Sequence, residues 1–88
     1  MPNVKFFAGL RSATGIKETS VSADSVRRLL DILVDTYPPL GEKLWDGTAI
    51  RSHVVITING HPLDPMLGPD IPVQSEDEIA IFPPIAGG

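Results

Sequence analysis

The amino-acid sequence predicts an α+β domain in which a mixed sheet of four to five strands carries one main helix on one face. Three observations lead to this prediction. Apolar residues alternate near both ends of the 88-residue chain, one helical stripe lies between those segments, and the elements follow the order hairpin, helix, further strands. In so short a chain, a helix that follows a hairpin must cover one face of one sheet to bury its apolar side.

A hairpin is predicted at the start of the chain. In residues 4–8 (VKFFA), successive side chains point to opposite faces, so that Lys5 and Phe7 face away from the helix. The side chains expected to face the helix are Val4, Phe6 and Ala8. Residues 9–15 (GLRSATG) are expected to form a loop, and residues 17–21 (KETSV) the second strand.

The helix is predicted from residues 24–39 (DSVRRLLDILVDTYPP), where apolar side chains recur three and four positions apart. The stripe consists of Val26, Leu29, Leu30, Leu33, Val34 and Tyr37. Asp24 or Ser25 can cap the helix, because a side-chain oxygen there accepts a bond from a free backbone N–H. Pro38 and Pro39 end it, since proline lacks the donor and clashes with the preceding turn.

The second half of the chain supplies the remaining strands. Residues 38–47 (PPLGEKLWDG) are expected to add a short turn of helix. Residues 53–58 (HVVITI) form a strand that ends at Asn59-Gly60, a strong tight-turn signal. Residues 61–75 are expected to be a loop-rich crossing with at most a short strand, and residues 78–82 (EIAIF) form the last strand.

The order of these elements predicts the topology. If the first and last strands pair at the centre of the sheet, they run parallel and are joined by a long crossover that contains the helix. That arrangement is the β-grasp fold. Residues 1–82 are expected to form this domain, and residues 83–88 an extended C-terminal tail.

Composition excludes several classes of function. The net charge of −4 and the pI of about 4.8 argue against a nucleic-acid partner, which calls for clustered Lys and Arg. No apolar run approaches the roughly 20 residues of a membrane span, and the N-terminal residues are too mixed for a signal peptide. We therefore expect a soluble cytoplasmic protein with no nucleic-acid or membrane partner.

The chain offers few groups for chemistry of its own. It has no cysteine, and His53 and His61 lack metal-ligand spacing, so no metal site is expected. The glycines of residues 9–15 lack the lysine of a phosphate loop, and no serine lies in a nucleophile elbow. We expect a protein that is not an enzyme by itself.

The outer face of the predicted sheet carries apolar residues. Alternation places Phe7, Val55 and Phe82 there, next to the tail, and a small protein seldom exposes such a patch unless it docks on a partner. The alternative is that a loop or a homodimer contact covers one of the aromatic rings.

The chain ends in IFPPIAGG (residues 81–88). Pro83 and Pro84 favour an extended, semi-rigid stem. Gly87 and Gly88 lack a Cβ and can therefore thread a narrow channel. The terminal carboxylate of Gly88 is inert until it is activated as a mixed anhydride with AMP, which a partner must do. Two glycines at a free end are otherwise a frayed remnant, because glycine adds nothing to a core.

Four segments resemble one family: the tail FPPIAGG, the opening VKFFAGLR, the helix that ends in YP, and the later ING. They are similar to the MoaD-like sulfur carriers, the small-subunit family of molybdopterin synthase. This family belongs to the ubiquitin-like β-grasp proteins of the ThiS/MoaD superfamily. The resemblance covers essentially the whole chain, and the FPP-x-x-GG tail is its specific signature.

The resemblance implies a mechanism. An E1-like adenylyltransferase (MoeB-like) would adenylate Gly88 with ATP, and a sulfur donor would convert it to a thiocarboxylate. The large synthase subunit (MoaE-like) would then accept the tail and transfer sulfur to a pterin precursor of the molybdenum cofactor.

The resemblance also assigns roles to residues. The residues that would thread the partner's active site are Pro83, Pro84, Ile85, Ala86 and Gly87. Phe7, Phe82 and Arg11 match interface positions of the family. No cofactor would be bound, because ATP is used by the activating partner.

One departure leaves the sulfur acceptor open. Residues 44–66 (LWDGTAIRSHVVITINGHPLDPM) are longer than in compact members of the family and look more like archaeal and actinobacterial relatives. Some of those relatives also tag protein lysines. Alternative roles are therefore a ubiquitin-like modifier, or a sulfur donor for tRNA thiolation, thiamine or cysteine synthesis.

Overall fold

The computed structural model describes residues 1–47, 49–51, 54–63, 68 and 70–83. Five strands form one sheet in the order β2-β1-β7-β5-β6. They are β1 (Asn3–Phe6), β2 (Glu18–Ser20), β5 (Val55–Ile58), β6 (His61–Pro62) and β7 (Glu78–Phe82). The short strands β3 (Trp45–Asp46) and β4 (Ala49–Ile50) form a separate two-stranded sheet. The helices are α1 (Gly9–Thr14), α2 (Val26–Thr36) and α3 (Leu40–Leu44).

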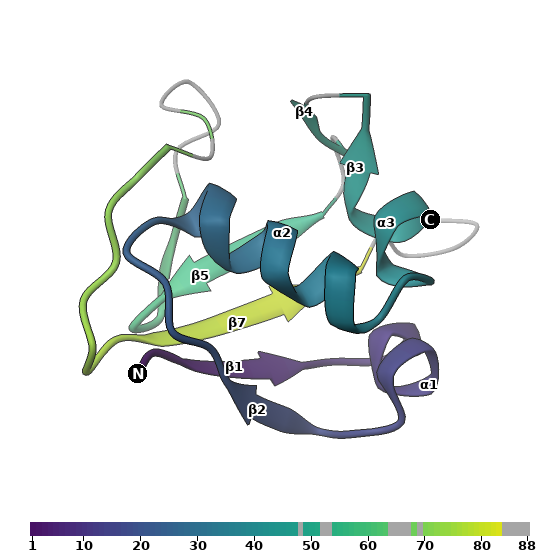
Figure 1. Ribbon diagram of the computed structural model, residues 1–88, viewed down its shortest axis with the longest axis horizontal. Coiled ribbons are helices and arrows are strands. Elements are labelled where there is room, and N and C mark those ends of the chain that lie inside the picture. Colours follow the sequence, from purple (N-terminus) through teal and green to yellow (C-terminus); the bar gives the residue numbers. More distant parts are fainter. Residues whose placement is uncertain (48, 52–53, 64–67, 69, 84–88) are drawn as a thin grey trace.

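The first and last strands pair at the centre of the sheet. β1 and β7 run parallel, with Val4 opposite Ile79 and Phe6 opposite Ile81. β2 and β5 flank this pair and run antiparallel to their neighbours, as Figure 1 shows. The crossover from β1 to β7 contains α2, so the predicted β-grasp topology is confirmed.

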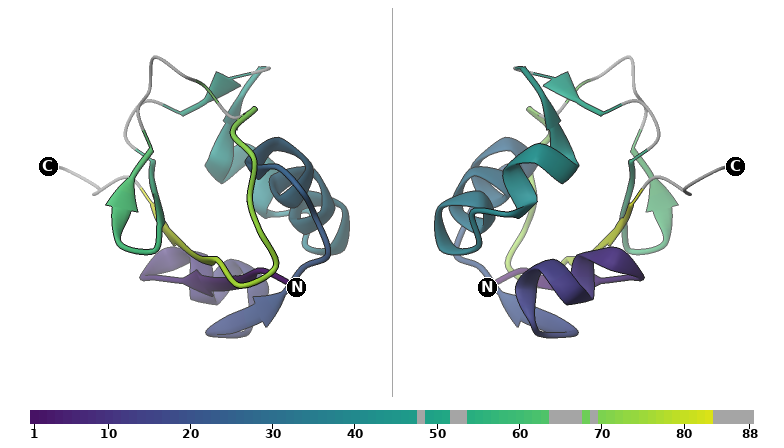
Figure 2. Two further views of the ribbon diagram at one scale, coloured as in Figure 1. Left: turned by 90° about the vertical axis from the view of Figure 1, so that its left-hand side faces the viewer. Right: turned by 90° about the vertical axis from the view of Figure 1, so that its right-hand side faces the viewer.

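The core lies between this sheet and α2, around which the sheet curves (Figure 2). We call the sheet face toward α2 the inner face and the opposite face the outer face. The buried apolar side chains are Val4, Phe6, Leu10, Val21, Val26, Leu29, Leu30, Leu33, Leu40, Leu44, Ile56, Val73, Ile79 and Ile81. No buried polar side chain occurs among the described residues. The inner face is therefore wholly apolar, as the alternation along the strands predicts.

α2 begins and ends where the sequence predicts. The Ser25 Oγ accepts a hydrogen bond of 3.1 Å from the Arg28 N–H, which satisfies one free donor of the first turn. The helix ends at Thr36, just before Tyr37 and the two prolines. Four residues of the predicted stripe are buried, and Val34 and Tyr37 are half-buried at its edge. The predicted short helix after the prolines is also present, as α3.

The prediction of a loop at residues 9–15 is wrong, because Gly9–Thr14 forms the helix α1. Leu10 is fully buried and anchors this single turn and a half to the core. Gly15 ends it with φ +78°, and its N–H donates to the Arg11 carbonyl at 2.7 Å. In Figure 1, α1 lies next to the end of β1.

The first strand is also shorter than predicted, since it ends at Phe6. Ala8 was expected on the inner face, but it is exposed and has φ +52° and ψ −129°. The chain turns sharply here, because the Leu10 N–H donates to the Phe7 carbonyl at 3.2 Å. The alternation therefore holds through Phe7 and fails at the turn.

The remaining strands follow the prediction closely. β5 ends in a tight turn in which Asn59 and Gly60 both have positive φ, as two-residue hairpin turns require. His53, which was expected to begin this strand, lies outside the described residues. Among the described residues of the crossing before β7, the structure shows the two-residue strand β6 and an isolated bridge between Ser25 and Pro72.

Two backbone bonds fasten this crossing to the start of α2. The Val26 N–H donates to the Ile71 carbonyl and the Val73 N–H donates to the Asp24 carbonyl, both at 2.9 Å.

Within the ranges that the structure describes, no helix is long and apolar enough to cross a membrane.

Candidate functional site

The predicted interface residues Phe7 and Phe82 lie against each other. Phe82 is the last residue of β7, and Phe7 directly follows β1. Their rings are stacked, with centroids 4.5 Å apart and planes inclined by 15°. Both neighbours in sequence, Phe6 and Ile81, are buried on the inner face, so alternation directs this stack to the outer face.

Arg11 joins the same group from α1. Its Nε–H donates to the Phe6 carbonyl at 2.9 Å, and its guanidinium carbon lies 5.5 Å from the centre of the Phe7 ring. A guanidinium over an aromatic face is attracted by the negative charge of that face. Helix α1, which the sequence reasoning missed, therefore positions the one basic residue among the predicted interface residues.

Val55 completes the group from the other side. It begins β5 directly opposite Phe82, and 46% of its surface is exposed, which makes it one of two large exposed apolar side chains among the described residues. We call Phe7, Arg11, Val55 and Phe82 the aromatic cluster. The structure thus brings together four residues from β5, β7, α1 and the end of β1.

The aromatic cluster lies where the chain leaves the sheet. Pro83 follows Phe82 directly and is half-buried. The other predicted tail residues, Pro84, Ile85, Ala86, Gly87 and Gly88, lie outside the described residues. The tail of the sequence therefore starts within one residue of the stacked rings.

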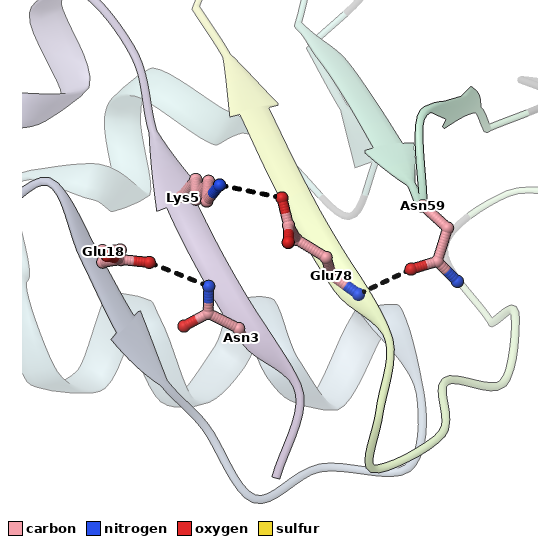
Figure 3. Close-up of polar contacts among 5 residues, drawn as sticks. All are labelled: Asn3, Lys5, Glu18, Asn59 and Glu78. Atoms are coloured by element: carbon pink, nitrogen blue, oxygen red, sulfur yellow. Dashed lines mark hydrogen bonds and ion pairs between the residues drawn. The ribbon is translucent and has the colours of Figure 1, made fainter.

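The opposite end of the outer face is polar, and we call its residues the polar network (Figure 3). The Lys5 Nζ lies 3.0 Å from the Glu78 Oε1, and the Asn3 Nδ2 donates to the Glu18 Oε2 at 2.9 Å. The Glu78 N–H donates to the Asn59 Oδ1 at 2.9 Å. A hydrogen bond to Glu78, strengthened by its charge, raises the pKa of Lys5.

Two features that often mark a catalytic centre are missing from the described residues. No three metal-ligating side chains come together among them, and every buried side chain there is apolar. A catalytic acid or base is typically marked by burial and a charge partner that shift its pKa strongly. Chemistry at the C-terminal carboxylate would need no such group in this chain.

Sequence reasoning missed α1 and the turn that starts it, although two signals were present. Leu10 and Thr14 stand four positions apart on one helical face, and Gly15 is a typical residue just after a helix. The helix is so short that its apolar pattern has only one repeat. The hairpin prediction therefore outweighed it.

Comparison with known proteins decides the family. A family model described as the ThiS family matches residues 4–88. The chain belongs to the ThiS family. Its fold and the sulfur-carrier resemblance predicted from the sequence are thereby confirmed.

Individual relatives agree with this assignment. The molybdopterin synthase sulfur carrier subunit of Arabidopsis thaliana is 35% identical over 89 residues, which cover 97% of this chain and 80% of that protein. The solution structure of small archaeal modifier protein 1 from Methanosarcina acetivorans is 33% identical with a TM-score of 0.82, covering 99% of this chain and 95% of that one. A chain of the BexX/CysO complex of Amycolatopsis orientalis has the same fold, with 20% identity, a TM-score of 0.87 and full coverage of both chains.

The ThiS-family relatives define what kind of protein this is. They are small ubiquitin-like sulfur carriers and modifiers, and such proteins are carriers rather than enzymes. Since the family match extends to residue 88, it includes the whole of the predicted tail.

Proposed function

We propose that this protein is the sulfur carrier of a molybdopterin synthase, with the carboxylate of Gly88 as its reactive group. The single observation that carries the proposal is the 35% identity to a molybdopterin synthase sulfur carrier subunit over nearly the whole chain. The aromatic cluster supports it, because an apolar surface with an arginine stands where the tail begins. Tyr, Trp, Phe and Arg are enriched at protein interfaces.

The proposed reaction begins with activation by an E1-like adenylyltransferase of the MoeB kind. A carboxylate oxygen of Gly88 attacks the α-phosphorus of ATP, an acyl-adenylate forms and pyrophosphate leaves. A donor that supplies sulfur at the oxidation level of hydrosulfide then adds to the acyl carbon. AMP leaves, and the C-terminus becomes a thiocarboxylate.

In the second half of the cycle, the tail enters the active site of a large subunit of the MoaE kind. The residues that we propose to thread this site are Pro83, Pro84, Ile85, Ala86 and Gly87. The thiocarboxylate sulfur bonds to a carbon of the pterin precursor and displaces an oxygen substituent, which leaves with the bonding electron pair. Water then cleaves the acyl–sulfur bond, which restores the carboxylate and leaves the sulfur on the pterin. This chain binds no cofactor in the proposal, because the activating enzyme uses the ATP. We place the cycle in the cytoplasm.

The experiment that tests the proposal follows sulfur at the C-terminus. The purified chain is incubated with a MoeB-like enzyme, ATP and sulfide, and intact-mass spectrometry detects replacement of one oxygen by sulfur. We expect the wild type to gain the sulfur. A variant without Gly87 and Gly88 should keep its fold by circular dichroism and gain none. Loss of the fold in that variant, or an unmodified wild type, would contradict the proposal.

A control variant with one alanine added after Gly88 separates the position of the carboxylate from its mere presence. It retains a terminal carboxylate, displaced by one residue, and we expect no thiocarboxylate from it.

Size-exclusion chromatography with the MoaE-like subunit tests whether the two proteins form a complex. A stable complex with the wild type is expected, and its absence would remove the molybdopterin assignment.

A second candidate is a ubiquitin-like modifier, favoured by the 33% identity to a small archaeal modifier protein. In that role an isopeptide bond would join Gly88 to a lysine of a target. Arg51 is the last basic residue, so trypsin would leave a long branch on a target lysine. An Ala86→Arg variant expressed in cells would instead leave a Gly-Gly remnant. Such remnants, absent from wild-type cells, would identify a modifier.

Sulfur transfer to tRNA, thiamine or cysteine synthesis uses the same thiocarboxylate. These roles differ from the leading proposal only in the acceptor. Incubating the thiocarboxylate form with the MoaE-like subunit and a pterin precursor distinguishes them, because only a molybdopterin carrier should lose its sulfur there.

A further inference from the structure

Arg11 makes two contacts within its own domain. Its Nε–H donates to the Phe6 carbonyl at 2.9 Å, at the point where the β1–β2 ladder ends. Its guanidinium also lies over the Phe7 ring, 5.5 Å from the centroid. One planar group therefore contacts both the backbone and the side chain of the segment that follows β1.

Phe7 in turn contacts β7 through its ring and its backbone. Its ring stacks on Phe82, and its N–H donates to the Ile81 carbonyl at 3.3 Å. Both contacts reach the last two residues of β7, and Pro83 comes next. A chain of contacts thus runs from Arg11 through Phe7 to the residues from which the tail departs.

 The conformation of Ala8, φ +52° and ψ −129°, is one that a residue with a Cβ rarely adopts. Backbone strain of this kind persists only where the surrounding structure holds it in place, and it is concentrated at functional sites. Buried Leu10 on one side and the paired Phe7 on the other hold this turn.

We propose that Arg11 is a positioning residue. It holds the Phe7–Phe82 stack in place and so positions Phe82 and Pro83, which the tail follows in the sequence. The inference rests on the proposed function in one respect, since that tail carries the reactive carboxylate. Arg11 itself touches neither the carboxylate nor any reacting atom in this role.

The chemistry of arginine distinguishes this role from simple attraction to a partner. A guanidinium can donate through Nε and lie flat on a ring at the same time, whereas the ammonium of lysine is a compact point charge on a flexible stem. An Arg11→Lys variant therefore keeps the charge and loses the positioning. If Arg11 acted on a partner by charge alone, lysine would replace it.

The test compares Arg11→Lys and Arg11→Gln with Arg51→Lys. Arg51 is a matched control, because its Nε–H also donates to a backbone carbonyl, that of Glu42 at 2.7 Å, away from the aromatic cluster. The first readout needs no partner: NMR of the isolated chain reports the ring protons of Phe7 and Phe82 and the residual dipolar couplings of Phe82. Both Arg11 variants should change these signals equally, and Arg51→Lys should leave them unchanged.

The second readout is ATP–pyrophosphate exchange with the MoeB-like enzyme. If the variants present the tail correctly only part of the time, the KM for the chain rises by the inverse of that fraction while kcat is kept. We expect KM to rise about fivefold in both Arg11 variants, which corresponds to a competent fraction near one fifth. Arg51→Lys should match the wild type.

The outcomes separate the two hypotheses. Unchanged NMR signals in Arg11→Lys, or a normal KM for Arg11→Lys with a raised KM for Arg11→Gln, would overturn the positioning role. If the wild type itself is not activated, the proposed function fails, and the NMR comparison alone decides the positioning role. A Phe7→Leu background gives an independent check, since Arg11→Gln should cause no further change once the ring is gone.

Discussion

The two ends of the outer face differ in chemistry, although β1 and β7 form both. Where β7 begins, the side chains of the polar network bond to one another, as in the 3.0 Å pair of Lys5 with Glu78. Where β7 ends, Phe7 and Phe82 stack and Val55 remains 46% exposed. Alternation along the strands is the same at both ends, so only the residue types and the local contacts create the difference.

This difference indicates which end is built for a partner. In the polar network, Asn59 accepts a hydrogen bond from the Glu78 N–H and donates one of 3.0 Å to Asp77, so these groups are satisfied within the domain. The aromatic cluster instead leaves apolar surface in contact with water, which is favourable to bury. We therefore predict that binding depends on the aromatic cluster and stability on the polar network.

The largest effect should come from placing a charge in the stack. Phe82→Asp should lower affinity for the MoaE-like subunit at least 30-fold, or about 2 kcal/mol, because a buried charge without a partner opposes docking at an aromatic hot spot. Isothermal titration calorimetry measures this. Glu18→Gln, in the polar network, is the control and should stay close to the wild type. Equal losses in both variants would refute the division of the outer face.

A smaller effect, on stability alone, is expected at Asn59. Asn59→Gly keeps the positive φ of the turn but removes the side-chain bonds to Asp77 and Glu78. The free energy of unfolding should fall by about 1–2 kcal/mol, measured by urea denaturation. Affinity for the partner should not change. A variant that binds poorly yet unfolds normally would reverse the proposed roles of the two ends.

Ala8 provides a change in the opposite direction. Ala8→Gly should relieve the strain at φ +52°, and the gain should exceed the extra entropy of glycine in the unfolded chain, for a net increase of roughly 0.5–1 kcal/mol. Ala13→Gly, within α1, is the matched control, and its free energy of unfolding should fall by about the same amount. Thermal unfolding shows whether each variant is more or less stable than the wild type. Destabilisation by Ala8→Gly would show that this turn carries no strain.

The smallest effect should be the pH dependence of the Lys5–Glu78 pair. Because the pKa of Lys5 is raised in the folded protein by its hydrogen bond to Glu78, the pair stabilises the fold fully below the unfolded lysine value, about 10.4. The contribution is lost as the pH rises through the higher folded value. Lys5→Met should therefore be less stable than the wild type at pH 8, and the difference should shrink above pH 11. A difference in stability between the variant and the wild type that stays the same across this pH range would show that the raised pKa of Lys5 does not contribute to stability.

Much of the fold could be predicted from periodicity. The stripe from Val26 to Tyr37 defined α2, and the alternation in residues 78–82 matched β7 to the residue. The outward direction of Phe7 and Phe82 followed from the same alternation, so their proximity could be predicted once β1 and β7 were paired. The stacking geometry and the contacts of Arg11 could not, because they depend on a helix that periodicity did not reveal.

The sequence by itself determined the elements with repeating patterns and predicted the parallel pairing of the first and last strands, and the chemistry that we propose for the Gly-Gly tail also rests on it. A repeat fixes the direction of each side chain locally, and the short chain leaves few ways to bury them. Only the tertiary structure decided that residues 9–14 form α1, since burial of Leu10 and the bond from Arg11 to the Phe6 carbonyl stabilise a turn that local preference disfavours at Ala8. Contacts distant in sequence outweighed local propensity there, and they placed Arg11 over Phe7.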